Sequence, residues 1–208
     1  AHSSTDVADS TSVDECASIV QGNHGRLDVL VTSAGILESS ANLLDMDLEA
    51  HDRLWRINYH GTIHCVRSFG KLMRAALHGA IVTVGSTTSF VAFPLPAYCP
   101  GKTAIRRLTE ILAVELGRFG VRVNGVATSY VITPAVPATI DAGERDAEVL
   151  RKSGALNMLV EPRHIADAVA FLCSEASSAI TGVMLPVDAG FNAAIPYRTY
   201  AGGVPWKE

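Results

Sequence analysis

The chain has 208 residues, of which 48% are hydrophobic and 18% charged, and its formal net charge is −4. This length suits a single domain with a sizeable buried core. The charged fraction lies below the roughly 25% of average soluble chains, so we expect contacts between subunits to hide part of the apolar surface. An acidic chain lacks the basic surface of nucleic-acid-binding proteins, and no apolar run reaches the ~18 residues of a membrane span. We therefore expect a soluble, cytoplasmic protein without a nucleic-acid or membrane partner.

The four cysteines lie far apart in the sequence and form no CxxC pair, and no histidine stands at a zinc-ligand spacing from them. We therefore expect reduced thiols and no metal site. The cysteines are Cys16, Cys65, Cys99 and Cys173.

Helix signals and short apolar runs alternate along the chain. Ser12 and Glu15 match a capping box, Gly25 is a typical helix stop, and Asp47 and Pro162 are plausible helix starts. Short Val-rich runs are typical of strands that are covered on both faces. In chain order we predict a helix over 12–24, a strand over 27–32, a helix over 47–77, a strand over 80–84, a helix over 98–118, a strand over 121–127, a helical segment over 142–150, a helix over 162–174 and a strand over 183–187.

This alternation predicts an α/β fold in which parallel strands are joined by helical crossovers. In such sheets, ligands bind at the carboxyl ends of the strands. Polar and small residues follow three of the predicted strands there, at 33–35, 85–86 and 128–129. We therefore expect the functional site at this edge.

Ser86, Tyr98 and Lys102 are the strongest candidates for chemistry. Tyr98 and Lys102 are four residues apart, so they project from one face of the helix that they open. An ammonium near a phenol favours the phenolate, which predicts a lowered Tyr98 pKa and a usable general acid and base. Ser86 ends the preceding strand and can offer its hydroxyl to the same substrate oxygen.

Several segments in the same order resemble the classical short-chain dehydrogenase/reductase family over almost the whole chain. They are GRLDVLVTSAG at 25–35, INYHG at 57–61, IVTVGS at 81–86, YCPGK at 98–102, VRVNGVA at 121–127 followed by VITP at 131–134, and ITGVMLPVDAG at 180–190.

The resemblance implies a single Rossmann-like domain, a doubly wound parallel sheet, that interconverts a secondary alcohol and a ketone with NAD or NADP. It assigns catalytic roles to four residues: Ser86 polarises the substrate oxygen, Tyr98 transfers the proton, Lys102 assists Tyr98 and binds the nicotinamide ribose, and Asn58 supports a proton relay. The choice between NAD and NADP stays open, because the residue that discriminates them follows a strand without a counterpart here. The implied cofactor-binding residues are Asp6, Val7, Ser33, Ala34, Gly35, Tyr98, Lys102, Val131 and Thr133.

The chain departs from the family pattern in three places. Pro100 and Gly101 stand between Tyr98 and Lys102, where Pro is tolerated because it falls in a first helical turn. Residues 128–129 are Thr-Ser in place of the usual Pro-Gly, which predicts a changed turn. The glycine-rich pyrophosphate turn that opens the family has no match, so we expect about 55 to 65 residues of the family to be absent and the strand at 27–31 to be an unpaired edge.

Two alternative functions stay open: a non-catalytic binding or assembly protein with the same fold, and a reductase of ketones bound to an acyl carrier. The carrier hypothesis would need a basic patch, for which Arg106 and Arg107 are candidates, although two arginines are more often a solvated helix face. We expect a substrate lid over 134–160 and a substrate wall that includes Phe93, Leu95 and Val131. The resemblance also implies a homo-oligomer, most often a tetramer.

Overall fold

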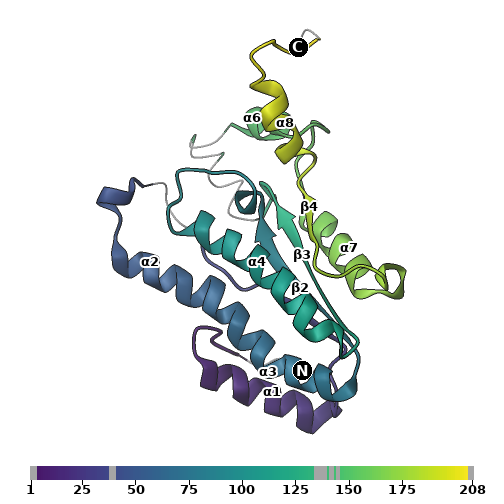
Figure 1. The fold of residues 1–208 in the computed structure, drawn as a ribbon. Coiled ribbons are helices and arrows are strands. Elements are labelled where there is room, and N and C mark those ends of the chain that lie inside the picture. The colour runs from purple at the N-terminus through teal and green to yellow at the C-terminus, as the bar shows by residue number, and fades with distance from the viewer. Residues whose placement is uncertain (1–3, 38–40, 134–139, 141–142, 144–145, 206–208) are drawn as a thin grey trace.

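A computed structural model describes residues 4–37, 41–133, 140, 143 and 146–205, in which helices alternate with strands (Figure 1). The elements are α1 (Ser10–His24), β1 (Val29–Thr32), α2 (Leu48–Trp55), α3 (Gly61–Ala76), β2 (Gly79–Ser86), α4 (Tyr98–Gly117), β3 (Val121–Thr128), α6 (Ala147–Ser153), α7 (Pro162–Cys173), β4 (Met184–Val187) and α8 (Phe191–Arg198). A π-helical turn (Arg56–His60) joins α2 to α3, and 3-10 turns lie at Leu43–Asp45, Thr87–Ser89 and Glu175–Ser177.

The four described strands form one sheet in the order β1-β2-β3-β4, and every neighbouring pair is parallel. The predicted α/β class and parallel sheet are therefore confirmed. The pairing of β2 with β3 runs from Gly79 opposite Val121 to Ser86 opposite Thr128. Both predicted strands extend a little further than expected, so that Ser86 and Thr128 end side by side at the carboxyl edge.

Helices cover both faces of the sheet, with α3 and α4 on one side and α7 on the other (Figure 1). Successive strand residues point to opposite faces, and β2 shows this directly. Ile81 packs with Val66 of α3 and Ala113 of α4, whereas Val82 packs with Leu172 of α7. The continuous apolar runs in the sequence are explained by these two buried layers.

The predicted capping box at the first helix is wrong. The helix α1 begins at Ser10, and Asp9 caps it by accepting a hydrogen bond from the Thr11 amide at 2.9 Å. The Ser12 hydroxyl instead accepts from the Asp6 amide at 3.0 Å, because Ser12 already lies inside the first turn. The other helix signals are confirmed: Gly25 ends α1 with a φ of 70°, and the Asp47 side chain caps α2.

The long helix predicted over 47–77 is interrupted by the π-helical turn at Arg56–His60. The apolar periodicity of this region continues across the turn, so the sequence pattern does not reveal it. Such single π turns inside helices are frequent at functional sites. Here the turn contains Asn58, one of the four predicted catalytic residues.

The strand β1 lies at one edge of the described sheet, and the helix α8 follows β4. In the described sheet, β1 has only β2 as a neighbour, and Val29 and Val31 are each 40% exposed, as predicted for an edge. The helix α8 lies beyond the last predicted strand and was not predicted. None of the described helices is long and apolar enough to cross a membrane.

Candidate active site

The fold brings Ser86, Tyr98 and Lys102 together at the carboxyl edge of the sheet. Ser86 is the last residue of β2, and Tyr98 opens α4, which packs across β2 and β3. The Tyr98 hydroxyl and the Ser86 side chain share a hydrogen bond, and the Lys102 Nζ lies 5.5 Å from the centre of the Tyr98 ring. The predicted trio is therefore one cluster in space.

Hydrogen bonds from the 3-10 turn after β2 hold Ser86 in place. The Ser86 Oγ accepts a hydrogen bond from the Thr88 amide at 3.2 Å, and Ser89 Oγ donates to the Lys102 carbonyl at 2.8 Å. Ser86, Thr88 and Ser89 are all buried. The turn thus ties the end of β2 to the first turns of α4 and fixes the spacing between the serine and the lysine.

Lys102 is a buried cation with no carboxylate partner among the described residues. Its side chain is 7% exposed, and its ammonium donates one hydrogen bond to the Val84 carbonyl at 2.7 Å. Burial lowers the pKa of Lys102 to about 8, because the charged form is deprived of water. Burial of the charged Lys102 therefore costs stability. A lysine placed there only for packing would have no need of its charge.

The predicted lowering of the Tyr98 pKa is wrong for this arrangement. Burial of the phenol is the largest effect and raises the Tyr98 pKa above its usual value, whereas the hydrogen bond from Ser86 lowers it and the neighbouring Cys99 raises it. The Lys102 ammonium faces the ring and the Val84 carbonyl. Burial therefore favours the protonated, proton-donating form of Tyr98 at neutral pH.

Asn58 reaches the site from the π-helical turn and holds the turn that follows β1. Its Oδ1 accepts from the Ile36 amide at 2.8 Å, and its Nδ2 donates to the Ile36 carbonyl at 2.9 Å. The side chain is 2% exposed, and both ends of its amide are used. The amide therefore positions residues 33–36, while the relay role that the resemblance implies stays a prediction.

The predicted cofactor residues on the β1 side lie around this turn. Ser33, Ala34 and Gly35 are exposed, and a Cβ on Gly35 would come within 3.2 Å of the Asn58 Oδ1. Val7 lies against Gly61, the first residue of α3. Its neighbour Asp6 is exposed and accepts from the Ala8 amide at 2.9 Å.

On the other side, Val131 and Thr133 follow β3. Val131 pairs with Val160 in an isolated parallel bridge, and Thr133 is exposed. Thr128 and Ser129 form their turn without a positive φ, so the missing glycine causes no backbone strain there. Of the predicted lid over 134–160, residues 134–139, 141–142 and 144–145 lie outside the described part.

The sequence reasoning missed an aromatic cluster near this edge. Phe191, at the start of α8, stacks on Phe93 with ring centres 6.0 Å apart and meets Tyr130 edge-on at 5.9 Å. Phe93 belongs to the loop before α4, where its carbonyl lies 3.7 Å from the Cys99 Sγ. The apolar segment after the Asp-Ala-Gly turn was the available signal for Phe191, but it follows the last recognised motif.

The described residues suit a nicotinamide cofactor and show no metal site. An ammonium has three donors, and Lys102 uses one on Val84, which leaves two for ribose hydroxyls. The lack of a Cβ on Gly35 leaves room for the Asn58 amide, which would lie within 3.2 Å of such an atom. Within the described residues, no group of three or more His, Cys, Asp or Glu could hold a metal ion.

Comparison with known proteins gives matches over most of the chain. A family model described as "Enoyl-(Acyl carrier protein) reductase" matches residues 2–192. Relatives named short-chain dehydrogenase reductases in Arabidopsis thaliana are 31–35% identical to the chain, over 89–93% of its length and 64–76% of theirs. The cis-4-hydroxycyclohexanecarboxylate dehydrogenase of Sinomonas cyclohexanicum is 37% identical over 190 residues, which are 91% of this chain and 75% of that protein.

Two solved structures extend the comparison to the fold. A chain described as ribose-5-phosphate isomerase from Brucella melitensis 16M is 40% identical, with a TM-score of 0.91 over 97% of this chain and 78% of that one. A gluconate 5-dehydrogenase from Burkholderia cenocepacia J2315, in complex with NADP and tartrate, is 29% identical, with a TM-score of 0.83 over 90% and 73% of the two chains.

Proposed function

The chain belongs to the short-chain dehydrogenase/reductase family, and from this premise we propose that Ser86, Tyr98, Lys102 and Asn58 form its catalytic site. As a member of that family it is an NAD(P)-dependent oxidoreductase that acts on CH–OH groups and ketones. The observation that supports the site best is the cluster of the buried Ser86 and Lys102 with the half-buried Tyr98 at the carboxyl edge of the sheet.

In the proposed reaction the bound nicotinamide supplies or accepts the hydride. Ser86 donates a hydrogen bond to the substrate oxygen and orients it. Tyr98 gives its phenolic proton to that oxygen during ketone reduction and takes it back during alcohol oxidation. Lys102 stabilises the phenolate that reduction leaves on Tyr98 and binds the ribose with its remaining donors.

We further propose that Asp6, Val7, Ser33, Ala34 and Gly35 form the adenosine side of the cofactor site. Val131 and Thr133 then form its nicotinamide side. Asn58 supports the first group through its two hydrogen bonds to Ile36. These residues do not distinguish NAD from NADP, so the choice between the two cofactors stays open.

We propose a cyclic or otherwise apolar hydroxy compound as the substrate class. The aromatic cluster of Phe93, Tyr130 and Phe191 offers an apolar wall close to the loop that leads into α4. The similarity to a cis-4-hydroxycyclohexanecarboxylate dehydrogenase points the same way. A lid within 134–160, which includes α6, would cover such a substrate.

The alternatives receive less support from the site. A non-catalytic protein gains nothing from a buried Lys102, whose charge costs stability. For an acyl-carrier partner, Arg106 and Arg107 are poor candidates because both pair with Glu110 of their own helix. The isomerase name of one similar structure suggests a reaction without net oxidation, which a nicotinamide assay separates from hydride transfer.

We also infer a homo-oligomer, and a tetramer fits the resemblance best. Val114 of α4 is 81% exposed and Ile111 is 47% exposed, so this helix presents apolar side chains that a second copy could cover. Analytical ultracentrifugation would show a monomer if this is wrong. A cytoplasmic location agrees with the four free cysteines.

The test of the function is a titration of the intact protein with NADH and NADPH, followed by turnover with 4-oxocyclohexanecarboxylate. We expect nicotinamide fluorescence to rise with at least one cofactor and the ketone to be reduced. A folded protein, by circular dichroism, that binds neither cofactor would contradict the proposal and favour the non-catalytic alternative. Conversion of ribose 5-phosphate without cofactor would favour the isomerase.

A further inference from the structure

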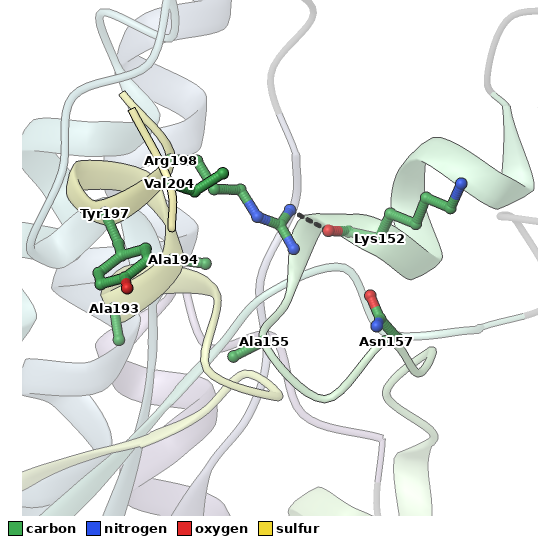
Figure 2. Close-up of a pocket in the computed structure, with 8 residues that line it drawn as sticks. All are labelled: Lys152, Ala155, Asn157, Ala193, Ala194, Tyr197, Arg198 and Val204. Carbon is green, nitrogen blue, oxygen red and sulfur yellow. Dashed lines mark hydrogen bonds between the residues drawn. The ribbon is translucent and has the colours of Figure 1, made fainter. Parts of the chain in front are cut away.

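Two features of the described structure have no role in the reaction so far. One is a cavity of about 680 Å³ between α6 and α8, but its polar lining residues Lys152, Asn157 and Arg198 are exposed, and no residue of the catalytic cluster lines it (Figure 2). The other is a contact between the His64 ring and the backbone of Val7. Of the two, only the contact of His64 touches the proposed cofactor site.

His64 belongs to α3 and lies one turn after the first residue of that helix. Its Nδ1 lies 2.9 Å from the carbonyl oxygen of Val7, which is 57 residues away in the sequence. A carbonyl oxygen can only accept a hydrogen bond, so the Nδ1 carries a proton and acts as the donor. This contact assigns the Nδ1–H tautomer to the neutral His64 ring.

Gly61 and His64 hold Val7 together from one face of α3. They are three residues apart, so they are neighbours on the helix surface. Val7 packs so closely on Gly61 that an added Cβ would lie 2.8 Å from the Val7 Cγ2 and 3.3 Å from the Val7 carbonyl oxygen. The missing side chain at Gly61 thus lets this carbonyl approach the helix, and His64 supplies the donor for it.

The Val7 carbonyl belongs to a peptide group that also contacts the Asp6 side chain. Peptide groups are planar, and the described chain has no cis bond, so the C=O and N–H of the Val7–Ala8 peptide point in opposite directions. The N–H of this peptide donates to the Asp6 Oδ1 at 2.9 Å. His64 therefore holds one side of the peptide while the Asp6 carboxylate accepts from the other. A rotation of the peptide would displace the carboxylate.

Within the described residues, the other hydrogen bonds of this segment stay local. The Asp6 amide donates to the Ser12 Oγ at 3.0 Å, and the Asp9 amide donates to the Asp6 carbonyl at 3.1 Å. Both bonds lie inside the segment or join it to the start of α1. His64 therefore supplies the hydrogen bond that fastens the segment to α3.

We propose that His64 is a positioning residue for cofactor binding: by holding the Val7–Ala8 peptide, it keeps residues 6–8 in place against the adenosine of NAD or NADP. This inference rests on the proposed function, because it concerns the adenosine side of that site. His64 acts through the peptide and does not touch the reacting atoms. Its loss should therefore weaken cofactor binding and leave the hydride transfer beside Tyr98 unchanged.

A comparison of His64→Leu with His64→Asn tests this role. Asparagine places its Nδ2 donor close to where the Nδ1 of histidine lies, whereas leucine has a similar shape and no donor. In fluorescence titrations with NADH and NADPH, we expect affinities within about twofold of the wild type for His64→Asn and about tenfold weaker for His64→Leu, because the Val7 carbonyl then lacks its donor. A role in helix stability alone predicts the opposite order, since leucine favours a helix more than asparagine does.

Half-cofactors show at which end of the cofactor the effect arises. The affinity for AMP, measured by displacement of the reduced cofactor, should also fall about tenfold in His64→Leu. The affinity for reduced nicotinamide mononucleotide should be unchanged, and so should kcat for ketone reduction at saturating cofactor. The matched control His24→Leu, at the exposed end of α1, should alter none of these values.

Nitrogen NMR of the wild-type protein, labelled at histidine, observes the ring proton without any variant. At about pH 8, where an ordinary histidine is neutral, His64 should be protonated at Nδ1 and bare at Nε2. A His64 ring protonated only at Nε2 would overturn the proposal. So would a folded His64→Leu, by circular dichroism, that binds NADH, NADPH and AMP as tightly as the wild type.

The same measurements separate this proposal from the proposed function. A wild type that binds AMP more tightly than His64→Leu but transfers no hydride to any ketone contradicts only the proposed reaction. Normal hydride transfer with equal cofactor affinity in the wild type and His64→Leu contradicts only the role of His64. A folded wild type that binds neither cofactor nor AMP contradicts both.

Discussion

At the scale of single residues, the site combines the buried amine of Lys102 with the half-buried phenol of Tyr98. Lys102 has no carboxylate partner among the described residues, and its ammonium donates a hydrogen bond to the Val84 carbonyl. Tyr98 has its pKa raised mainly by burial, so it holds its proton at neutral pH. Both groups therefore occupy environments that disfavour their charged forms, which is costly for stability and useful for proton transfer.

Replacement of Lys102 by methionine should stabilise the protein and inactivate it. A pKa of about 8 for a group whose usual value is 10.5 corresponds to about 3 kcal/mol at pH 7. Because the Val84 carbonyl loses a donor, we expect a net gain of about 1–3 kcal/mol in the free energy of unfolding, measured with urea.

The pH dependence of this gain gives a check on its cause. The folded state binds fewer protons at Lys102 than the unfolded state between about pH 8 and 10.5. The free energy of unfolding of the wild type therefore rises as the pH increases through this window, whereas that of Lys102→Met lacks this contribution. The stability advantage of Lys102→Met over the wild type should then shrink. A difference that is constant from pH 7 to 10.5 would show that burial of the charge is not its cause.

The raised Tyr98 pKa predicts opposite pH profiles for the two directions of reaction. Ketone reduction needs the protonated phenol, which is fully present at neutral pH, so its kcat/KM should be flat between pH 6 and 8. Alcohol oxidation needs the phenolate, so its kcat/KM should rise about tenfold per pH unit over this range. Steady-state rates in both directions measure this, and an oxidation optimum at pH 6 would be inconsistent with it.

At the scale of elements, the connection from α2 through the π-helical turn to α3 determines the shape of the cofactor side. The turn directs Asn58 toward Ile36, and α3 begins at Gly61 directly against Val7. Two segments that are far apart in the sequence are thereby fixed by one helix start. A change at that start should affect stability and cofactor binding together.

Gly61→Ala is the substitution that tests this packing. An added Cβ would lie 2.8 Å from the Val7 Cγ2 and 3.3 Å from the Val7 carbonyl oxygen, so Val7 must move. We expect a loss of about 1–3 kcal/mol in the free energy of unfolding and weaker NADPH fluorescence enhancement. Gly70→Ala in the same helix is the control, because its nearest contact would be 3.8 Å and alanine favours a helix by up to about 1 kcal/mol. If both variants are stabilised, the close contact with Val7 is not real.

The elements also show what the sequence could and could not predict. The bounds of the buried strands could be predicted to within two residues, because continuous apolar runs arise from burial on both faces of the sheet. Ser86, Tyr98 and Lys102 could be grouped because a strand end and a helix start fix their spacing. The π-helical turn and the cap at Asp9 could not be found, since each depends on one hydrogen bond among several that the sequence allows.

At the scale of the whole molecule, the fold places the aromatic cluster near the same edge of the sheet as the catalytic cluster, although Phe191 lies far from Tyr98 in the sequence. The catalytic cluster lies where β2 meets α4, and the aromatic cluster links the loop before α4 to α8. The sign of the Tyr98 pKa shift depends on how deeply this assembly buries the phenol, which no local spacing encodes. The arrangement supports a substrate held between the reacting centre and the carboxyl-terminal helix.

Tyr98 is the proton donor in the proposed reaction, and a single-turnover comparison of wild type and Tyr98→Phe tests this role most directly. The measured quantity is the rate of NADPH or NADH oxidation by the ketone in the preformed enzyme–cofactor complex. We predict a fall of about 10²–10⁴-fold in Tyr98→Phe, with cofactor affinity within about twofold of the wild type, because only the reacting hydroxyl is lost. A Tyr98→Phe protein that reduces the ketone at the wild-type rate would contradict the account.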